Sequence, residues 1–175
     1  PYEIRRGAGL RAGDEIVNRE LRREIGLAIV GCGTIGRIRA MLARDYPGVG
    51  WIGLCDKRAE IGDKLARDCG ADFFTTDFNE LLARPEVTAV IVATDENNHV
   101  RPTLAAVERG HALFIEKPLA TDAMESAEIL QAIETAGIDA VVGYTQRFRR
   151  RFLAVKERLV TGQIGDVHSV VTRAF

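Results

Sequence analysis

From Ile25 onwards, the sequence alternates short apolar runs of strand length with longer stretches whose apolar residues have helical spacing. The run VTAVIVAT, residues 87–94, is rich in the β-branched residues that favour strands. A parallel pair of strands needs a crossover connection, which is usually a helix. The alternation therefore predicts a mostly parallel sheet covered by helices on both faces. Six such runs in this order predict a doubly wound α/β fold.

Glycine, proline and polar residues mark the ends of the expected strands and helices. The strands are expected at 25–30, 49–56, 72–76, 87–94, 112–116 and 139–144, and the helices at 34–46, 58–69, 78–83, 99–109, 122–136 and 148–160.

The sequence divides into three parts. Residues 1–24 are polar with weak helical spacing, and we interpret them as an N-terminal extension, either a loose arm or a docking segment. Residues 25–146 form the predicted α/β domain. Residues 147–175 read as a linking helix followed by an alternating strand over 167–175, the opening of an α+β second domain. A lone strand ends a domain poorly, so we expect a truncated chain, the alternative being a strand that joins the main sheet or a partner.

Composition argues against several classes of partner. The chain has 24 basic and 25 acidic residues and a net charge of -1, which favours neither nucleic acid nor a membrane surface. Arg and Glu occur throughout the first two dozen residues, so no signal-peptide core is expected there. Cys32, Cys55 and Cys69 fit neither a zinc site nor a CxxC motif. We therefore predict no metal, and reduced thiols in a cytoplasmic protein.

A glycine-rich turn, GCGTIG, lies between the first predicted strand and the first predicted helix. In this pattern Gly31 permits the tight turn, Gly33 lets the backbone approach a pyrophosphate, and Gly36 allows close helix–strand packing. The helix N-terminus offers free N–H groups and partial positive charge to the phosphates. The turn predicts a dinucleotide-binding (Rossmann) domain whose cofactor contacts Gly31, Cys32, Gly33, Thr34, Ile35 and Gly36.

Asp56 ends the second predicted strand, 20 residues after Gly36, as this fingerprint expects. A carboxylate there accepts hydrogen bonds from the adenosine ribose hydroxyls and repels a 2′-phosphate. Lys57 and Arg58 follow directly and could instead hold that phosphate, or could be solvated residues at a helix start. NAD is the favoured cofactor, and NADP stays open.

Ligands of such sheets bind outside the carboxyl ends of the strands. Ala93 and Thr94 end the fourth strand, and Glu116 and Lys117 follow the fifth. The Lys117 ammonium could donate to a substrate oxygen beside the nicotinamide, or could simply pair with Glu116 or another acid. His99 fits a helix cap or a satisfied surface group as well as a ligand.

Three segments, AIVGCGTIG, ATDENNHV…LAAVERGHALFIEKPLA and VGYTQRF…VKERLVTGQIGDVHSV, together resemble the glucose–fructose oxidoreductase / inositol dehydrogenase (Gfo/Idh/MocA) family. The resemblance runs from about residue 25 to the end of the chain. It implies an N-terminal Rossmann domain joined to a C-terminal domain on a large open sheet. It also implies NAD(P)-dependent oxidation or reduction of sugars, polyols and similar small alcohols, and we expect the full-length protein to be a homo-oligomer.

The resemblance also assigns roles to single residues. Lys117 falls on the family's EKP lysine, which contacts the reacting hydroxyl. The resemblance therefore makes Lys117 the candidate catalytic residue. Glu116 and Thr94 fall on positions that line the nicotinamide side. His99 matches the histidine of the turn after strand four, and Arg147 matches an arginine near the cofactor after strand six.

The chain departs from the family pattern in two respects. Asp95 and Glu96 replace the usual Pro and Asn, which weakens the expectation for that turn. The family's catalytic Asp and His lie in the second domain, so this chain should bind dinucleotide and show little turnover. Two alternatives stay open: a non-catalytic dinucleotide sensor, which would not need Lys117, and a methyltransferase, against which the third glycine and the EKP element argue.

Overall fold

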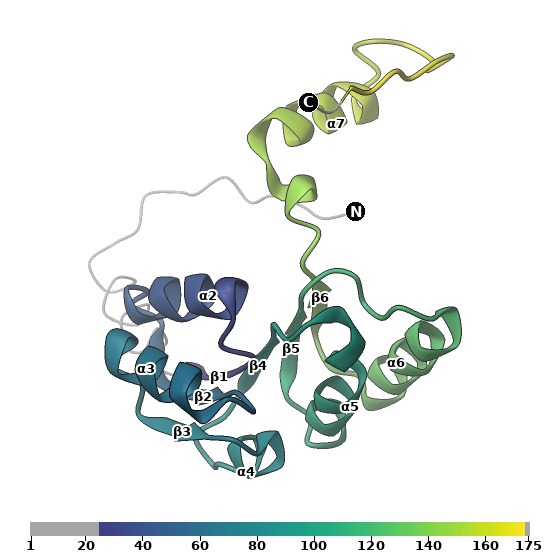
Figure 1. The fold of residues 1–175 in the computed structure, drawn as a ribbon. Coiled ribbons are helices and arrows are strands. Elements are labelled where there is room, and N and C mark those ends of the chain that lie inside the picture. The colour runs from purple at the N-terminus through teal and green to yellow at the C-terminus, as the bar shows by residue number, and fades with distance from the viewer. Residues whose placement is uncertain (1–24, 174–175) are drawn as a thin grey trace, which may run out of the picture. The chain divides into compact units, whose positions relative to one another are not determined.

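The computed structural model describes residues 25–173, and the predicted N-terminal extension 1–24 lies outside the described residues. These residues fall into two compact units that divide after Gly143, and each unit is described by itself. The first unit carries all six strands and five of the α-helices (Figure 1).

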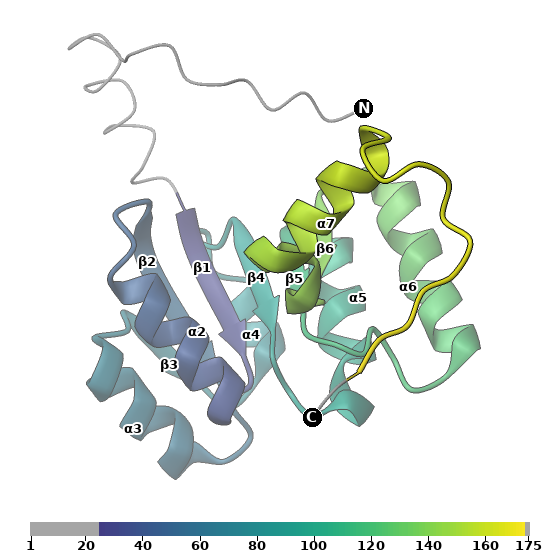
Figure 2. The same ribbon diagram turned by 90° about the horizontal axis from the view of Figure 1, so that it is seen from above.

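The six strands form one sheet in the order β3-β2-β1-β4-β5-β6, and every neighbouring pair is parallel (Figure 2). In chain order they are β1 (Ile25–Val30), β2 (Val49–Cys55), β3 (Phe73–Thr75), β4 (Ala89–Val92), β5 (Ala112–Ile115) and β6 (Ala140–Val142). The predicted doubly wound parallel sheet is confirmed. The order reverses between β1 and β4, the switch point at which such sheets bind ligands.

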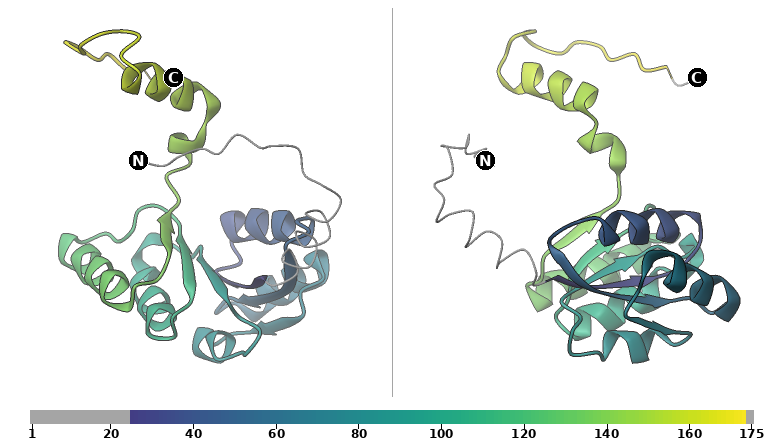
Figure 3. Two further views of the ribbon diagram at one scale, coloured as in Figure 1. Left: turned by 180° about the vertical axis from the view of Figure 1, so that it is seen from behind. Right: turned by 90° about the vertical axis from the view of Figure 1, so that its left-hand side faces the viewer.

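Helices connect the strands and cover both faces of the sheet (Figure 3). They are α2 (Thr34–Arg44), α3 (Ala59–Cys69), α4 (Phe78–Leu82), the 3-10 turn η1 (Glu96–Asn98), α5 (Val100–Glu108) and α6 (Ala123–Ala136). Among residues 25–173, none of the helices combines the length and the apolar character that crossing a bilayer requires.

The hydrophobic core consists of two clusters, and the central strand β1 contributes side chains to both. Its residues are buried from Gly26 to Val30, and alternate side chains enter different clusters. Leu27 and Ile29 join the cluster under α2 and α3, whereas Ala28 and Val30 join the cluster under α4, α5 and α6. A strand buried on both faces must be apolar at successive positions, which is the pattern that IGLAIV shows.

The second unit contains the 3-10 turn η2 (Thr145–Phe148) and the helix α7 (Arg150–Val160). The helix expected at 148–160 is therefore present. Residues 167–173, the described part of the strand expected at 167–175, form no strand in the structure, and the second domain that this strand would open stays a prediction. Alternating sequence becomes a strand only when another edge accepts its hydrogen bonds, and no described strand pairs with this segment.

Candidate functional site

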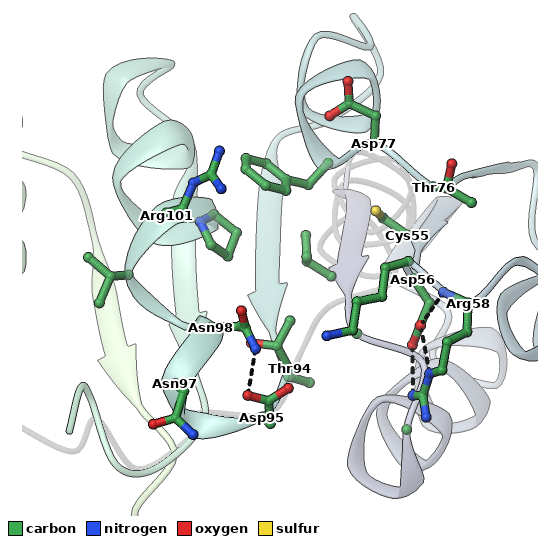
Figure 4. A pocket seen from close by; sticks show the side chains of 18 of the residues that line it. Cys55, Asp56, Arg58, Thr76, Asp77, Thr94, Asp95, Asn97, Asn98 and Arg101 are labelled. Carbon is green, nitrogen blue, oxygen red and sulfur yellow. Dashed lines mark hydrogen bonds and ion pairs between the residues drawn. The ribbon is translucent and has the colours of Figure 1, made fainter.

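A pocket of about 960 Å³ opens at the carboxyl edge of the sheet, within the first unit (Figure 4). It lies over the ends of β1, β2, β3 and β4, on both sides of the switch point. Residues of the predicted site that line it are Gly31, Gly33, Thr34, Ile35, Asp56, Lys57, Arg58, Ala93 and Thr94. The others in the first unit, which do not line it, are Cys32, Gly36, His99, Glu116 and Lys117.

The three glycines of the turn have different surroundings. Gly31 has a φ of +101°, and a Cβ there would lie 2.6 Å from the carbonyl carbon of Ala93. A Cβ on Gly36 would collide with the carbonyl oxygen of Gly31. Gly33, by contrast, has ordinary backbone geometry and no atom within 4 Å of a Cβ position. Gly31 and Gly36 therefore allow the chain to pack, whereas Gly33 leaves open space beside the backbone.

Helix α2 begins at Thr34 without a side-chain cap. Its N-cap residue is Gly33, no side chain accepts a hydrogen bond from the first turn, and that turn contains no acidic residue. The first N–H groups of a helix have no partner within the helix, and they carry partial positive charge. The uncapped end beside Gly33 is thus suited to bind an anion such as a pyrophosphate.

Asp56 follows β2 and is only 6% exposed. Its Oδ2 accepts a hydrogen bond of 2.8 Å from the main-chain N–H of Cys32 in the glycine turn. Its Oδ1 accepts from the main-chain N–H of Arg58 at 2.9 Å and from the Arg58 Nε at 3.2 Å (Figure 4). Burial opposes the charged form, but the hydrogen bonds from Arg58 and Cys32 outweigh it and lower the pKa of the Asp56 carboxyl.

Thr94 and Asp95 line the pocket after β4. The Thr94 Oγ1 is buried and has no hydrogen-bond partner among the described residues. Asp95 is exposed and accepts a hydrogen bond of 2.6 Å from Asn98 Nδ2. The Asp95 side chain is therefore engaged locally with Asn98.

His99 is 1% exposed and lies outside the pocket lining. Its Nδ1 is 2.8 Å from the carbonyl oxygen of Pro118, and its Nε2 is 3.2 Å from the carbonyl oxygen of Thr94. The ring thus connects the turn after β4 to the turn after β5. A neutral imidazole has a single N–H, so it donates to one of these two carbonyl groups at a time.

The residues after β5 have contrasting environments. Glu116 is buried and pairs with Arg39 of α2, whose Nε donates to Glu116 Oε1 at 3.0 Å. Lys117 is exposed, and its peptide bond to Pro118 is cis. No salt bridge to Lys117 forms within residues 25–173. Lys117 and Glu116, which are neighbours in the sequence, therefore do not form an ion pair with each other in the structure.

Arg147 belongs to the second unit, in η2. Its guanidinium carbon lies 5.7 Å from the ring centroid of Tyr144, within the same unit. Its expected place near the cofactor therefore stays a prediction.

The sequence analysis missed part of the pocket wall. This part follows β3 and enters α5, and it includes Thr76, Asp77, Phe78, Asn79, Val100, Arg101 and Pro102. The rule that ligands bind at carboxyl ends of strands could have found the first four, because they come directly after β3. β3 is only three residues long, and its end carries no motif that draws attention.

Comparison with known proteins agrees with this geometry. Residues 25–144 match the model of the Gfo/Idh/MocA family, described as an oxidoreductase family with an NAD-binding Rossmann fold. The chain is 28% identical over 146 residues to scyllo-inositol 2-dehydrogenase (NAD(+)) of Bacillus subtilis, covering 83% of this chain and 43% of that protein. It is 34% identical over 147 residues to inositol 2-dehydrogenase of Gluconacetobacter diazotrophicus, covering 82% of this chain and 43% of that protein. The chain thus spans less than half the length of these relatives.

A solved structure of an inositol dehydrogenase also resembles this chain in fold. Myo-inositol dehydrogenase from Lactobacillus casei, crystallised with NAD(H) and myo-inositol, superposes with a TM-score of 0.78 and 27% identity. The match covers 82% of this chain and 43% of that protein. The glycine turn, the acid after β2 and the family match over 25–144 converge: this chain belongs to the Gfo/Idh/MocA family of oxidoreductases, with its NAD-binding Rossmann fold.

Proposed function

We propose that the pocket holds NAD with its pyrophosphate over Gly33, its adenosine ribose at Asp56 and its nicotinamide end toward Thr94. The observation that carries this proposal is the open space at Gly33 beside the uncapped N-terminus of α2. The unpartnered Thr94 Oγ1 in the same pocket supports it, because a buried hydroxyl group normally has a partner.

The full-length protein is then an oxidoreductase acting on a sugar, a polyol or a related small alcohol. Bound NAD supplies the chemistry by accepting a hydride from, or returning it to, the carbon that bears the reacting oxygen. Lys117 donates a hydrogen bond to that oxygen and stabilises the negative charge that develops on it. Its exposure and its lack of a salt bridge to residues 25–173 leave its ammonium group available for this role.

The substrate class rests on the relatives. The proteins from Bacillus subtilis and Gluconacetobacter diazotrophicus are inositol dehydrogenases, and the Lactobacillus casei structure contains myo-inositol beside NAD(H). A ring of secondary alcohols suits a site whose Lys117 offers hydrogen-bond donors and no acceptor. The first substrates to test are therefore myo-inositol and scyllo-inositol.

Replacing Lys117 in the full-length protein separates binding from chemistry. We expect Lys117→Ala to bind NADH within about threefold of the wild type while turnover on inositols falls at least about a hundredfold, or roughly 2.7 kcal/mol of transition-state stabilisation. Lys64→Ala is the matched control, because Lys64 forms a surface pair with Asp68 at 2.8 Å. Turnover that survives in Lys117→Ala contradicts the role of Lys117. A wild type that binds NADH yet turns over no sugar or polyol is a sensor instead.

A further inference from the structure

An ion pair joins two parts of the first unit that lie 77 residues apart in the sequence. Arg39, in α2, donates from both Nε and Nη2 to Oε1 of Glu116, the Nε bond being 3.0 Å long. The two side chains are only 24% and 12% exposed. Salt screens partly buried pairs less than surface pairs, so this interaction persists at physiological ionic strength.

Further contacts hold both partners in place. The Arg39 guanidinium carbon lies 4.7 Å from the centroid of the Phe114 ring, a cation–π distance. Phe114 and Glu116 are two residues apart in an extended segment, so their side chains share one face of the sheet. The other carboxylate oxygen, Oε2, would be 2.9 Å from a Cβ on Gly143, so glycine leaves room for the carboxylate there. Arg39 therefore meets Glu116 in a defined geometry.

Glu116, the anion of this pair, directly precedes Lys117 in the sequence. A buried carboxylate that loses its cation is strongly disfavoured unless another cation replaces it. Lys117 is adjacent in sequence, exposed, and without a salt bridge among residues 25–173. Without Arg39, the Lys117 ammonium would be the nearest cation along the chain for Glu116, and it would be withdrawn from any substrate.

We propose that Arg39 is a positioning residue that neutralises Glu116 and thereby keeps the Lys117 ammonium free to meet the reacting oxygen. The inference rests on the proposed function in that it takes Lys117 as the group that contacts substrate. It adds a residue outside the pocket lining, in the helix that follows the phosphate-binding turn. Arg39 acts through Glu116 and need not touch substrate or cofactor.

Amine labelling of the cofactor-free, full-length protein tests this directly. Acetic anhydride would be applied in trace amount, and acetylation of Lys117 would be measured by mass spectrometry relative to Lys156, which is exposed on α7. We expect Arg39→Ala to slow Lys117 labelling about fivefold and the double variant Arg39→Ala, Glu116→Gln to restore the wild-type rate. Unchanged labelling in Arg39→Ala overturns the proposal.

Two controls address structural damage. Arg37 lies in the same helix as Arg39 and forms a surface pair with Asp68. Arg37→Ala removes that pair and should leave Lys117 labelling unchanged. Glu116→Gln alone should also leave it unchanged, because Glu116 contacts Arg39 in the wild type. Faster labelling in Glu116→Gln would show that Glu116 already pairs with Lys117 and would overturn the proposal, even if Arg39→Ala did not fold.

A kinetic measurement distinguishes positioning from a purely structural role. With myo-inositol as the probe substrate, we expect Arg39→Ala to lower kcat about tenfold with the KM for NAD within about threefold, and Arg39→Lys to recover most of the loss. A fall confined to NAD affinity would overturn the proposal. Because the labelling uses no cofactor, failure of the wild type to bind NADH would reject the proposed function separately.

Discussion

The carboxylate of Asp56 accepts a hydrogen bond of 2.8 Å from the main-chain N–H of Cys32, so the acid after β2 holds the glycine turn after β1. The same carboxylate also accepts hydrogen bonds from the main-chain N–H and the guanidinium of Arg58. Asp56 therefore has a structural role within the pocket, in addition to its proposed role toward the ribose.

Asp56→Asn should reveal this structural role through the pH dependence of stability. The folded-state pKa of Asp56 is lowered, so its contribution is present above the unfolded-state pKa of about 4 and is lost as the pH falls through the folded value. We expect the free energy of unfolding of the variant to be lower by about 1.5–3 kcal/mol at pH 7, as for other charged hydrogen bonds, and to fall less than that of the wild type on acidification. Urea unfolding at pH 7 and below pH 4 measures both quantities. Parallel acid profiles for the two proteins would contradict this assignment.

Gly33→Ser should change stability and binding in opposite directions. The φ of Gly33 is -67°, a Cβ there meets nothing, and serine is a preferred N-cap residue. The variant should be as stable as the wild type or a few tenths of a kcal/mol more stable. Its side chain would fill the space proposed for the pyrophosphate and compete for the N–H groups, so NADH affinity should fall at least about tenfold. Thermal unfolding and calorimetric titration check the two effects; undiminished binding would show that the cofactor lies elsewhere.

Gly36→Ala provides the contrast within the same turn. Its Cβ would collide with the carbonyl oxygen of Gly31, a main-chain atom that cannot move alone. We expect the free energy of unfolding to fall by about 1–3 kcal/mol, as for other overpacked sites. Denaturant unfolding measures it, and a variant of wild-type stability would disprove the tight packing of α2 against the turn.

The three cysteines should be unreactive in the folded protein. All three are free and buried, and burial is the largest cause that raises the pKa of Cys32 and of Cys55 to about 12. Ellman's reagent at pH 8 should modify them only after unfolding. Because the folded-state pKa values of Cys32 and Cys55 are raised, the stability that these buried protonated thiols contribute is complete below about pH 8.5 and is lost as the pH rises toward 12. Rapid modification of the native protein would contradict the burial.

Local patterns in the sequence predicted the sheet and much of the pocket. The six apolar runs correspond to β1 through β6, and the glycine turn precedes α2 as its motif requires. Both depend on residues close together in the chain. Residues 167–173 form no strand, because strand formation depends on a partner edge, which an alternating sequence cannot guarantee.

The pairing of Arg39 with Glu116 could not be predicted from such patterns. Arg39 looks like a solvated helix residue, and only the folded sheet brings its side chain to Phe114 of β5 and to the carboxylate of Glu116, 77 residues later. His99 is a similar case: the sequence offered a cap, a surface group or a ligand, whereas its ring lies buried between the carbonyl oxygens of Thr94 and Pro118.

Calorimetric titration of the folded chain with NADH and, separately, NADPH is the most direct test of the proposed cofactor site. A 2′-phosphate beside the Asp56 carboxylate would be repelled by about 4 kcal/mol at 4 Å in a medium of effective dielectric constant about 20. Arg58, which pairs with that carboxylate, reduces the repulsion. We predict one NADH bound per chain, at least about tenfold more tightly than NADPH. The absence of binding heat with either coenzyme would contradict the account.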